Sequence, residues 1–315
     1  MWLTDTSELV RQLKEKGVSR VALQFPEGLK RHSFRIAKTL KDAGFFVVVS
    51  GDPCYGACDL ATGLLGYVDV VIHFGHSPLE RNPLILYEPF HQDFDLDSLE
   101  LVIPYFSGKE TGFVTTIQHT HMVPAIEAFF SKRNIKCRAY PGTHRTPSPG
   151  QILGCSYEAA RICPGNEILF IGTGAFHPLG VALATGRKVI ALDPYSRSVE
   201  VVSAERFLRR RFALIEKAKH AKNFGIILSL KSGQRRQELA ERLAGLKREA
   251  VLIVMNEVTP EQLLNLGFGA YVNTACPRLA YDDQSRFPVP VLTPGEFEIL
   301  CGLAKFEDYQ IDEIS

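Results

Sequence analysis

The sequence has neither a long hydrophobic run nor an excess of charge of either sign. Of its 315 residues, 36 are Lys or Arg and 35 are Asp or Glu, so the formal net charge is +1. A general nucleic-acid-binding protein normally has a clear basic excess, which argues against DNA or RNA as a partner. Apolar runs such as 45–49 and 250–255 have the length of strands and fall far short of the roughly 20 residues of a membrane-spanning helix. We therefore expect neither nucleic acid nor a membrane as a partner.

The N-terminal segment lacks the features of a secretory signal. It has acidic residues early, no apolar central region and no small-residue cleavage site, so no signal peptide is predicted. Leu3, Leu9, Val10 and Leu13 instead follow helical spacing, and Thr6 suits the start of a helix. These features predict a cytoplasmic protein.

The seven cysteines include no C-x2-C pair, which excludes the common zinc ribbons. The C-x3-C-x2-C run of ordinary radical enzymes is also absent, because the C-x3-C pair of Cys54 and Cys58 lacks a third member. An odd number of cysteines in a reducing compartment argues against a disulfide framework. A metal site in this chain must therefore collect its ligands from distant segments.

What the sequence does contain is a repeated alternation of short β-rich runs and helical segments. Such alternation predicts βαβ units and parallel sheets. The predicted strands fall into three groups of four: 21–25, 45–50, 68–73 and 84–87; then 113–118, 136–140, 167–171 and 188–192; then 225–230, 250–255, 270–273 and 289–292. Helical periodicity is predicted between strands, as at 29–43, 122–134 and 261–266.

Three groups of four strands predict an α/β fold with three similar subdomains, each a small parallel sheet flanked by helices, around a pseudo-threefold centre. The predicted limits are 1–98, 99–205 and 206–315. The first seam is expected near 97–100, and the second within a charged helix predicted over 196–222. In that helix Arg209, Arg210 and Arg211 form a basic cluster, which we interpret as a solvated helix face rather than a docking patch.

Each predicted subdomain has one cysteine shortly after a strand, in a loop rich in Gly, Pro or Asp. These are Cys58, Cys155 and Cys276, which are 97 and 121 residues apart. Ligands of open α/β sheets bind beyond the carboxyl ends of the strands, so three such loops can point at one centre. Three thiolates at one centre suit an iron–sulfur cluster with one iron left open. Spacing alone also leaves the ordinary alternative, that each is a small buried hydrophobic residue.

The other cysteines are expected to have different roles. Cys137 and Cys163 lie beside predicted strands and are interpreted as core residues. Cys301 lies on an apolar helical segment and is also expected to be buried. Cys54 shares its loop with Cys58 and is an alternative to it as a ligand.

Seven segments, in their order along the chain, resemble the archaeal family of diphthamide-synthesis enzymes, the 2-(3-amino-3-carboxypropyl)histidine synthases. They are 24–28 (QFPEG), 52–59 (DPCYGACD), 73–77 (HFGHS), 150–155 (GQILGC), 172–178 (GTGAFHP), 276–283 (CPRLAYDD) and 292–297 (LTPGEF). The resemblance spans nearly the whole chain, and the cysteine motifs are specific as a set.

This resemblance implies a transferase with a noncanonical radical mechanism. It implies a [4Fe-4S] cluster held by Cys58, Cys155 and Cys276, with S-adenosylmethionine as substrate. It further implies transfer of the 3-amino-3-carboxypropyl group to C2 of a histidine of elongation factor 2, which is the first step of diphthamide synthesis. The implied partners are elongation factor 2, an unidentified electron donor and a second copy of the chain in a homodimer.

Location in the sequence predicts which residues contact S-adenosylmethionine. Arg278 can hold a carboxylate with its planar guanidinium, and Asp282 or Asp283 can bind the amino group or orient Arg278. The other predicted contacts lie at or just after predicted strand ends: Gly172, Thr173, Gly174, Gln118, His119 and Gln234. For the glycines a tight βα turn is an equal alternative, and for His119 a structural hydrogen bond is the more common role. The same structural reading applies to His73, His76 and His177, although His73 and His76 can mimic a metal-binding pair.

Two other functions remain open from the sequence. One is a quinolinate synthase-like hydro-lyase, in which an open iron acts as a Lewis acid on a small diacid without a radical. The other is a non-catalytic, cluster-bearing scaffold subunit. The HFGHS and CPR segments favour diphthamide synthesis over the first alternative, and the presence of all three cysteines argues against the second.

Overall fold

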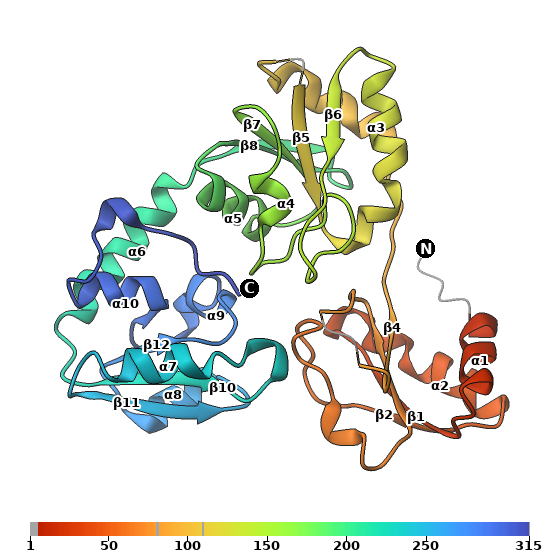
Figure 1. Cartoon of the computed structure of the whole chain (residues 1–315), viewed down its shortest axis with the longest axis horizontal. Coiled ribbons are helices and arrows are strands. Elements are labelled where there is room, and N and C mark those ends of the chain that lie inside the picture. Colours follow the sequence, from red (N-terminus) through yellow and green to blue (C-terminus); the bar gives the residue numbers. More distant parts are fainter. Residues whose placement is uncertain (1–5, 80–81, 109, 315) are drawn as a thin grey trace.

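The computed structural model describes residues 6–79, 82–108 and 110–314, and it has three lobes around a common centre (Figure 1). Each lobe is built on one sheet with helices packed against it. The lobes follow one another along the chain, from the red-orange first lobe through the green second lobe to the blue third lobe. The predicted α/β fold with three similar subdomains is confirmed.

The three sheets share one strand order, in which the first strand of each lobe lies between the second and the third. The first lobe contains β1 (Arg20–Gln24), β2 (Phe46–Val49), β3 (Val70–Phe74) and β4 (Ile85–Glu88). The second contains β5 (Glu110–Thr115), β6 (Lys136–Ala139), β7 (Glu167–Ile171), β8 (Lys188–Asp193) and β9 (Ser198–Val202). The third contains β10 (Phe224–Ser229), β11 (Ala250–Met255), β12 (Ala270–Asn273) and β13 (Val291–Leu292). All pairings are parallel except β8 with β9, so the strands direct their carboxyl ends to one edge of each sheet.

Helices cover the sheets of all three lobes. The α-helices are α1 (Thr6–Glu15), α2 (Ser33–Asp42), α3 (Val123–Ser131), α4 (Glu158–Arg161), α5 (Phe176–Thr185), α6 (Glu205–Ala218), α7 (Gln237–Ala244), α8 (Pro260–Leu266), α9 (Arg278–Tyr281) and α10 (Pro294–Leu300). A 3-10 helix at Leu96–Tyr105 connects the first lobe to β5, close to the predicted seam. None of the helices in the described part of the chain combines the length and apolar character needed to span a bilayer.

The central strands are buried on both faces, which explains their continuous apolar sequences. Strands β3, β7 and β10 have no exposed residue, and each lies between hydrophobic clusters formed with helices of its own lobe. The predicted N-terminal helix is present as α1, whose Leu9 and Leu13 are fully buried; Leu3 lies outside the described residues.

The predicted charged helix over 196–222 is wrong in its first part. Residues Ser198–Val202 form β9, which pairs antiparallel with β8, and helix α6 begins only at Glu205. The segment SVEVV has β-branched residues at alternate positions, which favour an edge strand over a helix. The described residues therefore contain thirteen strands, one more than predicted.

The interpretation of Arg209, Arg210 and Arg211 as one solvated face is also wrong for Arg211. Its side chain is 2% exposed and forms an ion pair of 2.5 Å with the fully buried Glu296. It also donates hydrogen bonds to the backbone carbonyls of Ala280 and Val291. Because 3.6 residues make one helical turn, three consecutive arginines cannot share a face, and Arg211 points into the third lobe.

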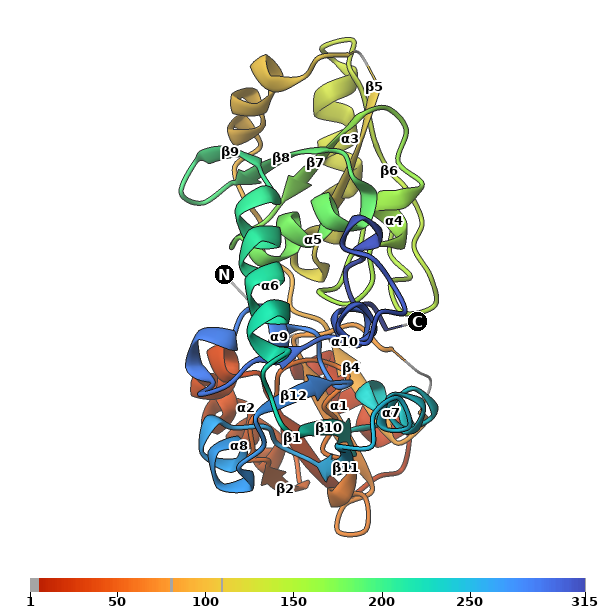
Figure 2. The same cartoon turned by 90° about the vertical axis from the view of Figure 1, so that its left-hand side faces the viewer.

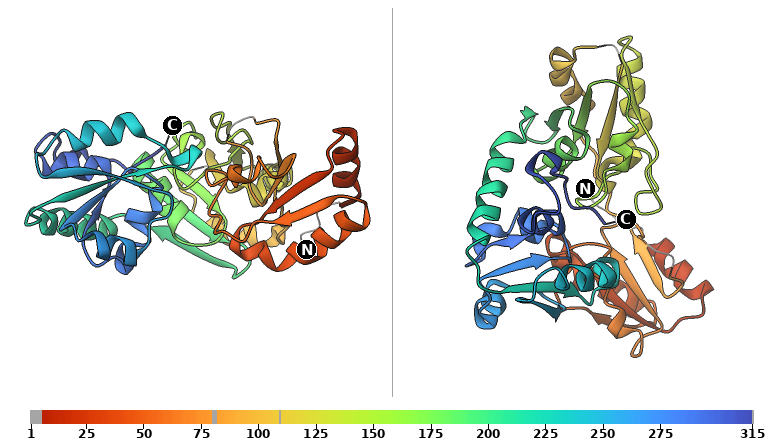
Figure 3. Two further views of the ribbon diagram at one scale, coloured as in Figure 1. Left: turned by 90° about the horizontal axis from the view of Figure 1, so that it is seen from below. Right: turned by 60° about the vertical axis from the view of Figure 1, so that its left-hand side comes forward.

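The segment 311–314 crosses from the third lobe back to the second; Figure 1 places the C-terminal end between the lobes, and Figures 2 and 3 show that it lies toward one face of the molecule. The amide of Ile314 donates to the carbonyl of Cys155 at 2.9 Å, and Glu313 accepts from the amide of Tyr157. Glu313 also pairs with Arg161 of α4. Each predicted subdomain contains one of the three sheets, while the limits 1–98, 99–205 and 206–315 stay a prediction.

Candidate metal centre and adjoining cavities

Cys58 lies in the loop that follows β2, at the carboxyl end of the first sheet. The loop is held by the backbone of Asp59, whose amide donates to Gly56 and whose carbonyl accepts from the side chain of Gln24 on β1. The carboxylate of Asp59 also forms a 2.9 Å ion pair with Lys231 of the third lobe. The loop bearing Cys58 is thus fixed both to its own sheet and to the third lobe.

Cys155 lies at the tip of a tight turn in the second lobe. The amides and carbonyls of Leu153 and Ser156 bond to each other, which closes the turn around Gly154 and Cys155. A Cβ atom on Gly154 would lie 2.4 Å from the ring of Phe176, so only glycine allows this close approach.

Cys276 lies between β12 and α9 in the third lobe. The side chain of Asn273, the last residue of β12, accepts from the amide of Ala275 and donates to the carbonyl of Cys276. The amide of Leu279 in α9 donates to the same carbonyl. This side-chain turn sets the direction of the Cys276 thiol at the end of the strand.

The three cysteines, one from each lobe, line the same cavity. Burial raises the pKa of each thiol, to about 11 for Cys155 and about 12 for Cys276. The charge of the Cys58 thiolate raises the pKa of the other two thiols further, as expected for groups that lie close together. Free thiolates are therefore unfavourable here unless a positive centre offsets their charge.

The spacing of the three sulfurs favours a cluster over a single ion. Within the described ranges, they do not form a set whose ligand atoms all lie within 4.8 Å of one another. Tetrahedral zinc would need sulfurs about 3.8 Å apart, because each Zn–S bond is about 2.3 Å long. The wider spacing fits the larger volume of an iron–sulfur cluster with cysteine ligands.

Two N–H donors from other segments point at these sulfurs. The side-chain amide of Gln234 lies 3.2 Å from Sγ of Cys58, and Nη2 of Arg145 lies 3.9 Å from Sγ of Cys155. Arg145 is 7% exposed, and its Nε is buried without a hydrogen-bond partner. Next to Gln234, a Cβ on Gly233 would lie 2.5 Å from Cα of Cys58, so this approach requires glycine.

Arg145 was not predicted from the sequence, because it lies in an irregular loop ten residues before Cys155 and outside every motif. The only local signal is a lone arginine among Gly, Pro and Thr residues. Gln234 was predicted as a contact of S-adenosylmethionine, and in the structure its amide is engaged with Cys58.

Two cavities adjoin the cysteines, each with a volume of about 260 Å³. One extends between the first and second lobes, past His76, Gln118 and His177. The other extends over the third lobe, past Lys231 and Glu257. Both are lined by Tyr55, Cys58, Cys276 and Arg278. Together they reach the range of roughly 300–1,000 Å³ typical of small-molecule sites.

Arg278 stands where these cavities meet. Its side chain is 54% exposed and pairs with Asp282 at 2.9 Å, and its guanidinium lies 5.0 Å from the ring centroid of Phe176. Asp282 therefore orients Arg278. Asp283 instead pairs with Arg286 and lines the cavity of the third lobe.

The remaining predicted contacts are divided among three cavities. Gln118 lines the cavity of the cysteines. His119 and Thr173 line a neighbouring cavity with His76 and His177, and Nδ1 of the buried His119 bonds to the carbonyl of Gln92.

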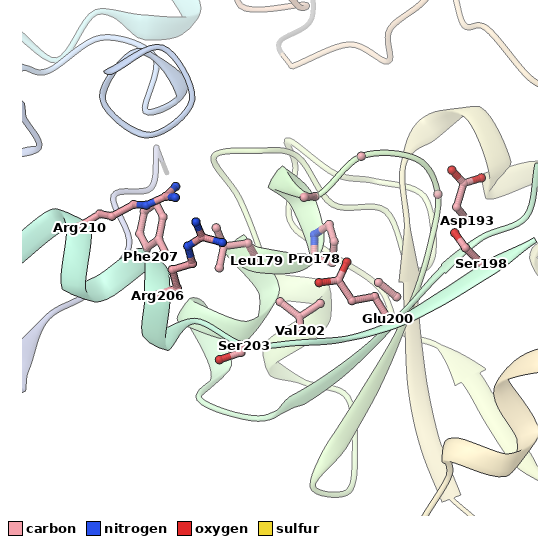
Figure 4. A pocket seen from close by; sticks show the side chains of 14 residues that line it. Pro178, Leu179, Asp193, Ser198, Glu200, Val202, Ser203, Arg206, Phe207 and Arg210 are labelled. Atoms are coloured by element: carbon pink, nitrogen blue, oxygen red, sulfur yellow. The ribbon is translucent and has the colours of Figure 1, made fainter. Parts of the chain in front are cut away.

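Gly172 and Gly174 line a separate cavity of 410 Å³ in the second lobe, which also includes Asp193, Arg206 and Arg210 (Figure 4). In Figure 4, Arg206 and Arg210 extend from α6 beside Leu179 of α5. None of the residues lining this cavity also lines the cavity of the cysteines. The structure therefore does not bring Gly172 and Gly174 to the candidate metal centre.

The other cysteines are placed largely as expected. Cys137 and Cys163 are buried within the second lobe, and Cys54 is buried in the loop of Cys58. Cys301 is half-buried at the end of α10, rather than buried as predicted.

Comparisons with known proteins agree with the resemblance in the sequence. The family model of diphthamide synthesis proteins matches residues 25–310. The 2-(3-amino-3-carboxypropyl)histidine synthase of Pyrococcus horikoshii is 42% identical, over 98% of this chain and 92% of that protein. The enzyme of the same name from Methanocaldococcus jannaschii is 28% identical over the same shares.

The crystal structure of Dph2 from Pyrococcus horikoshii with a 4Fe-4S cluster superimposes with a TM-score of 0.93 at 40% identity, covering 100% of this chain and 95% of that one. A family match over most of the length, a 42% identical relative and the shared three-lobed fold all point the same way. The chain belongs to the diphthamide synthesis protein family.

Proposed function

We propose that this protein transfers the 3-amino-3-carboxypropyl group of S-adenosylmethionine to C2 of a histidine of elongation factor 2, at a [4Fe-4S] cluster held by Cys58, Cys155 and Cys276. The products are 5′-methylthioadenosine, the modified histidine and the proton displaced from C2, so atoms and electrons balance. A bound cluster would supply the single electron that cleaves the bond between the sulfonium sulfur and Cγ of the methionyl part, and it would regain that electron when the imidazole adduct loses the C2 proton, so the transfer consumes no net electron.

The observation that carries this proposal is the meeting of three cysteines, from three different sheets, on one cavity. Among the described residues, their sulfurs do not form a set within 4.8 Å of one another, and three protein ligands leave one position of a four-iron cluster open to substrate. The relative of known structure is described as containing a 4Fe-4S cluster, which supports the same ligand chemistry here.

The protein's own contribution is binding, orientation and exclusion of water. Arg278 offers its guanidinium at the junction of the two cavities, which suits the carboxylate of the methionyl part. Asp282 holds Arg278 in place. Arg145 and Gln234 place N–H groups on the cysteine sulfurs, where they stabilise negative charge. Which C–S bond breaks depends on which carbon these contacts aim at the open iron.

Replacing Arg278 by alanine is expected to weaken binding of S-adenosylmethionine while leaving the cluster in place. A charge-assisted bond contributes about 1.5–3 kcal/mol, and the partial exposure of Arg278 favours the low end, which is about a tenfold rise in Kd. Calorimetry on the cluster-loaded enzyme measures this. Arg242→Ala is the matched control, because Arg242 is 52% exposed and pairs with Glu298. Equal affinity in the Arg278 and Arg242 variants would contradict the proposed contact.

Replacing Arg145 by methionine is expected to lower the reduction potential of the cluster. The guanidinium beside Cys155 stabilises the reduced cluster, which carries one more negative charge than the oxidised cluster. Its loss therefore makes reduction of the cluster less favourable. A redox titration followed by electron paramagnetic resonance measures the potential directly. Arg145→Lys keeps the positive charge, so the reduction potential of its cluster should stay close to that of the wild-type enzyme. An unchanged potential in Arg145→Met would assign Arg145 to packing alone.

The reaction is tested by supplying the reduced, cluster-loaded enzyme with labelled S-adenosylmethionine and an acceptor. We expect 5′-methylthioadenosine and label on whole elongation factor 2, but not on a variant in which the target histidine is replaced, nor on free histidine. The acceptor loop must reach van der Waals distance of the reacting carbon, so a folded partner has to present it to the cavity.

The outcomes separate the alternatives. Formation of 5′-deoxyadenosine would indicate ordinary radical cleavage instead. Condensation of dihydroxyacetone phosphate with iminoaspartate, without cleavage of S-adenosylmethionine, would support the hydro-lyase. Cluster binding without either reaction would support a scaffold subunit.

The homodimer, the electron donor, the absence of nucleic acid among the partners and the cytoplasmic location stay predictions. Sedimentation equilibrium of the cluster-loaded protein tests the homodimer.

A further inference from the structure

A second group of metal-binding side chains lies in the first lobe and has no part in the proposed reaction. Sγ of Cys54 and ring nitrogens of His73 and His76 all lie within 4.8 Å of one another. Cys54 and His73 are 2% and 0% exposed, and His76 is half-buried. His73 is the penultimate residue of β3, and His76 lies two residues after the end of that strand.

The hydrogen bonds around His73 determine which of its nitrogens has a free lone pair. The amide of Gln24 is oriented from both sides: its Nε2 donates to the carbonyl of Asp59 at 2.6 Å, and its Oε1 accepts from the amide of Ala61 at 3.0 Å. The same Oε1 lies 2.8 Å from Nδ1 of His73, so Nδ1 carries the proton. Nε2 of His73 therefore has its lone pair directed at Nδ1 of His76, 2.9 Å away.

His73 therefore has the hydrogen-bonding environment of a metal-binding histidine, with a lone pair free on one ring nitrogen and the other ring nitrogen donating a hydrogen bond. Metal-binding histidines almost always donate their other ring N–H to a carbonyl, a carboxylate or water, which fixes the tautomer and the ring orientation. Burial lowers the pKa of His73 to about 3 and that of His76 to about 4, so both rings are neutral at physiological pH. Among the described residues, the thiol of Cys54 has one hydrogen-bond contact, a long one of 3.9 Å with the carbonyl of Gly56.

We propose that Cys54, His73 and His76 bind a zinc ion at a site separate from the three cysteines of the candidate cluster. One thiolate and two imidazoles are a donor set that suits zinc, and three protein ligands leave a fourth position for water. Bonds of about 2.0–2.1 Å at a tetrahedral ion place two nitrogens about 3.3 Å apart. The pair of histidines therefore needs to open by only a few tenths of an ångström, with the proton of His76 moving to its other nitrogen.

The site would connect two structural elements that also define the cluster cavity. Cys54 and Cys58 lie in one loop, and His76 lines the cavity next to Cys58. A zinc ion would tie this loop to the end of β3, in addition to the bonds from Gln24 to the loop. The proposal does not depend on the reaction, because it concerns ligands that the proposed transfer does not use.

The first test measures zinc and iron per chain in the cluster-loaded enzyme, after zinc is supplied and loosely bound metal is removed with a weak chelator. We expect about one zinc besides about four iron atoms. Cys54→Ser and His76→Gln should each lose the zinc and keep the iron. Cys163→Ser and His177→Gln are the controls and should keep both, since Cys163 bonds to Ala159 and His177 lies outside the group.

Cobalt provides a second readout, which reports the type and geometry of the ligands directly. The protein with Cys58, Cys155 and Cys276 replaced by serine is titrated with Co²⁺, which removes competition from the cluster ligands. A thiolate-to-cobalt charge-transfer band and tetrahedral ligand-field bands are expected, and adding Cys54→Ser should abolish the charge-transfer band. Wild-type enzyme that retains no zinc, zinc that persists in Cys54→Ser, or cobalt bands without thiolate character would each overturn the site.

Discussion

Replacing any one of Cys58, Cys155 and Cys276 by alanine is expected to abolish the cluster absorbance and to lower turnover by at least about a hundredfold. Losses of 10–100-fold are typical for residues that merely support a metal ligand, so loss of a ligand itself should cost no less. Each lobe supplies one of the three residues, and within the cavity no neighbouring cysteine can replace Cys155 or Cys276. Iron content, the visible spectrum and formation of 5′-methylthioadenosine measure the effect.

Cysteines of similar burial elsewhere in the chain provide the controls. Cys137→Ala and Cys163→Ala remove thiols from the core of the second lobe, and Cys301→Ala removes a half-buried thiol of the third. All three variants should keep the iron and the activity. An intact cluster in Cys58→Ala would transfer the ligand role to Cys54, which lies in the same loop.

The second large effect is expected for stability, at the pair of Arg211 and Glu296. Replacing Arg211 by methionine should lower the free energy of unfolding by about 3–5 kcal/mol, because it leaves a buried carboxylate without its charge partner. Within the described part of the chain, the donors left to the Glu296 carboxylate would be the hydroxyl of Tyr309 and the backbone amide of Thr293 at the start of its own helix. Urea unfolding of the cluster-free protein, followed by circular dichroism, measures the change.

The neighbouring Arg209 tests whether this cost is specific. Arg209 lies on the exposed side of α6 and pairs with Glu205, and both side chains are more than 70% exposed. Arg209→Met should change the free energy of unfolding by less than about 0.5 kcal/mol. Similar losses in the two variants would mean that helix propensity, rather than the buried ion pair, causes the effect.

Much of the fold could be predicted because its signals are local. Buried parallel strands such as β7 and β10 have mostly apolar sequences, and each is followed by a turn and a helix. The placement of Cys58, Cys155 and Cys276 after strands could be read in the same way. Strand β9 was missed because its short alternating run is joined directly to a charged helix, and charge dominated the interpretation.

The features that could not be predicted from the sequence depend on contacts between segments far apart in the chain. Arg211 differs from Arg209 only by the side of α6 on which it lies, and its partner is 85 residues away. Arg145 acquires its position through Cys155 and Gly233, the latter 88 residues away in the third lobe. The pairing of Gln24 with His73, which determines the tautomer, likewise spans 49 residues. No local pattern contains such information.

The return of residues 311–314 to the second lobe has a consequence for biogenesis. Because the amide of Ile314 bonds to the carbonyl of Cys155, the turn that carries this cysteine reaches its final form only when synthesis has passed residue 314. Domains generally fold as units from the N-terminus while the chain is being made. The first two lobes can therefore fold on the ribosome, but a nascent chain presents no complete set of ligands. Iron and sulfide would therefore be delivered only after the third lobe and residues 311–314 have been made.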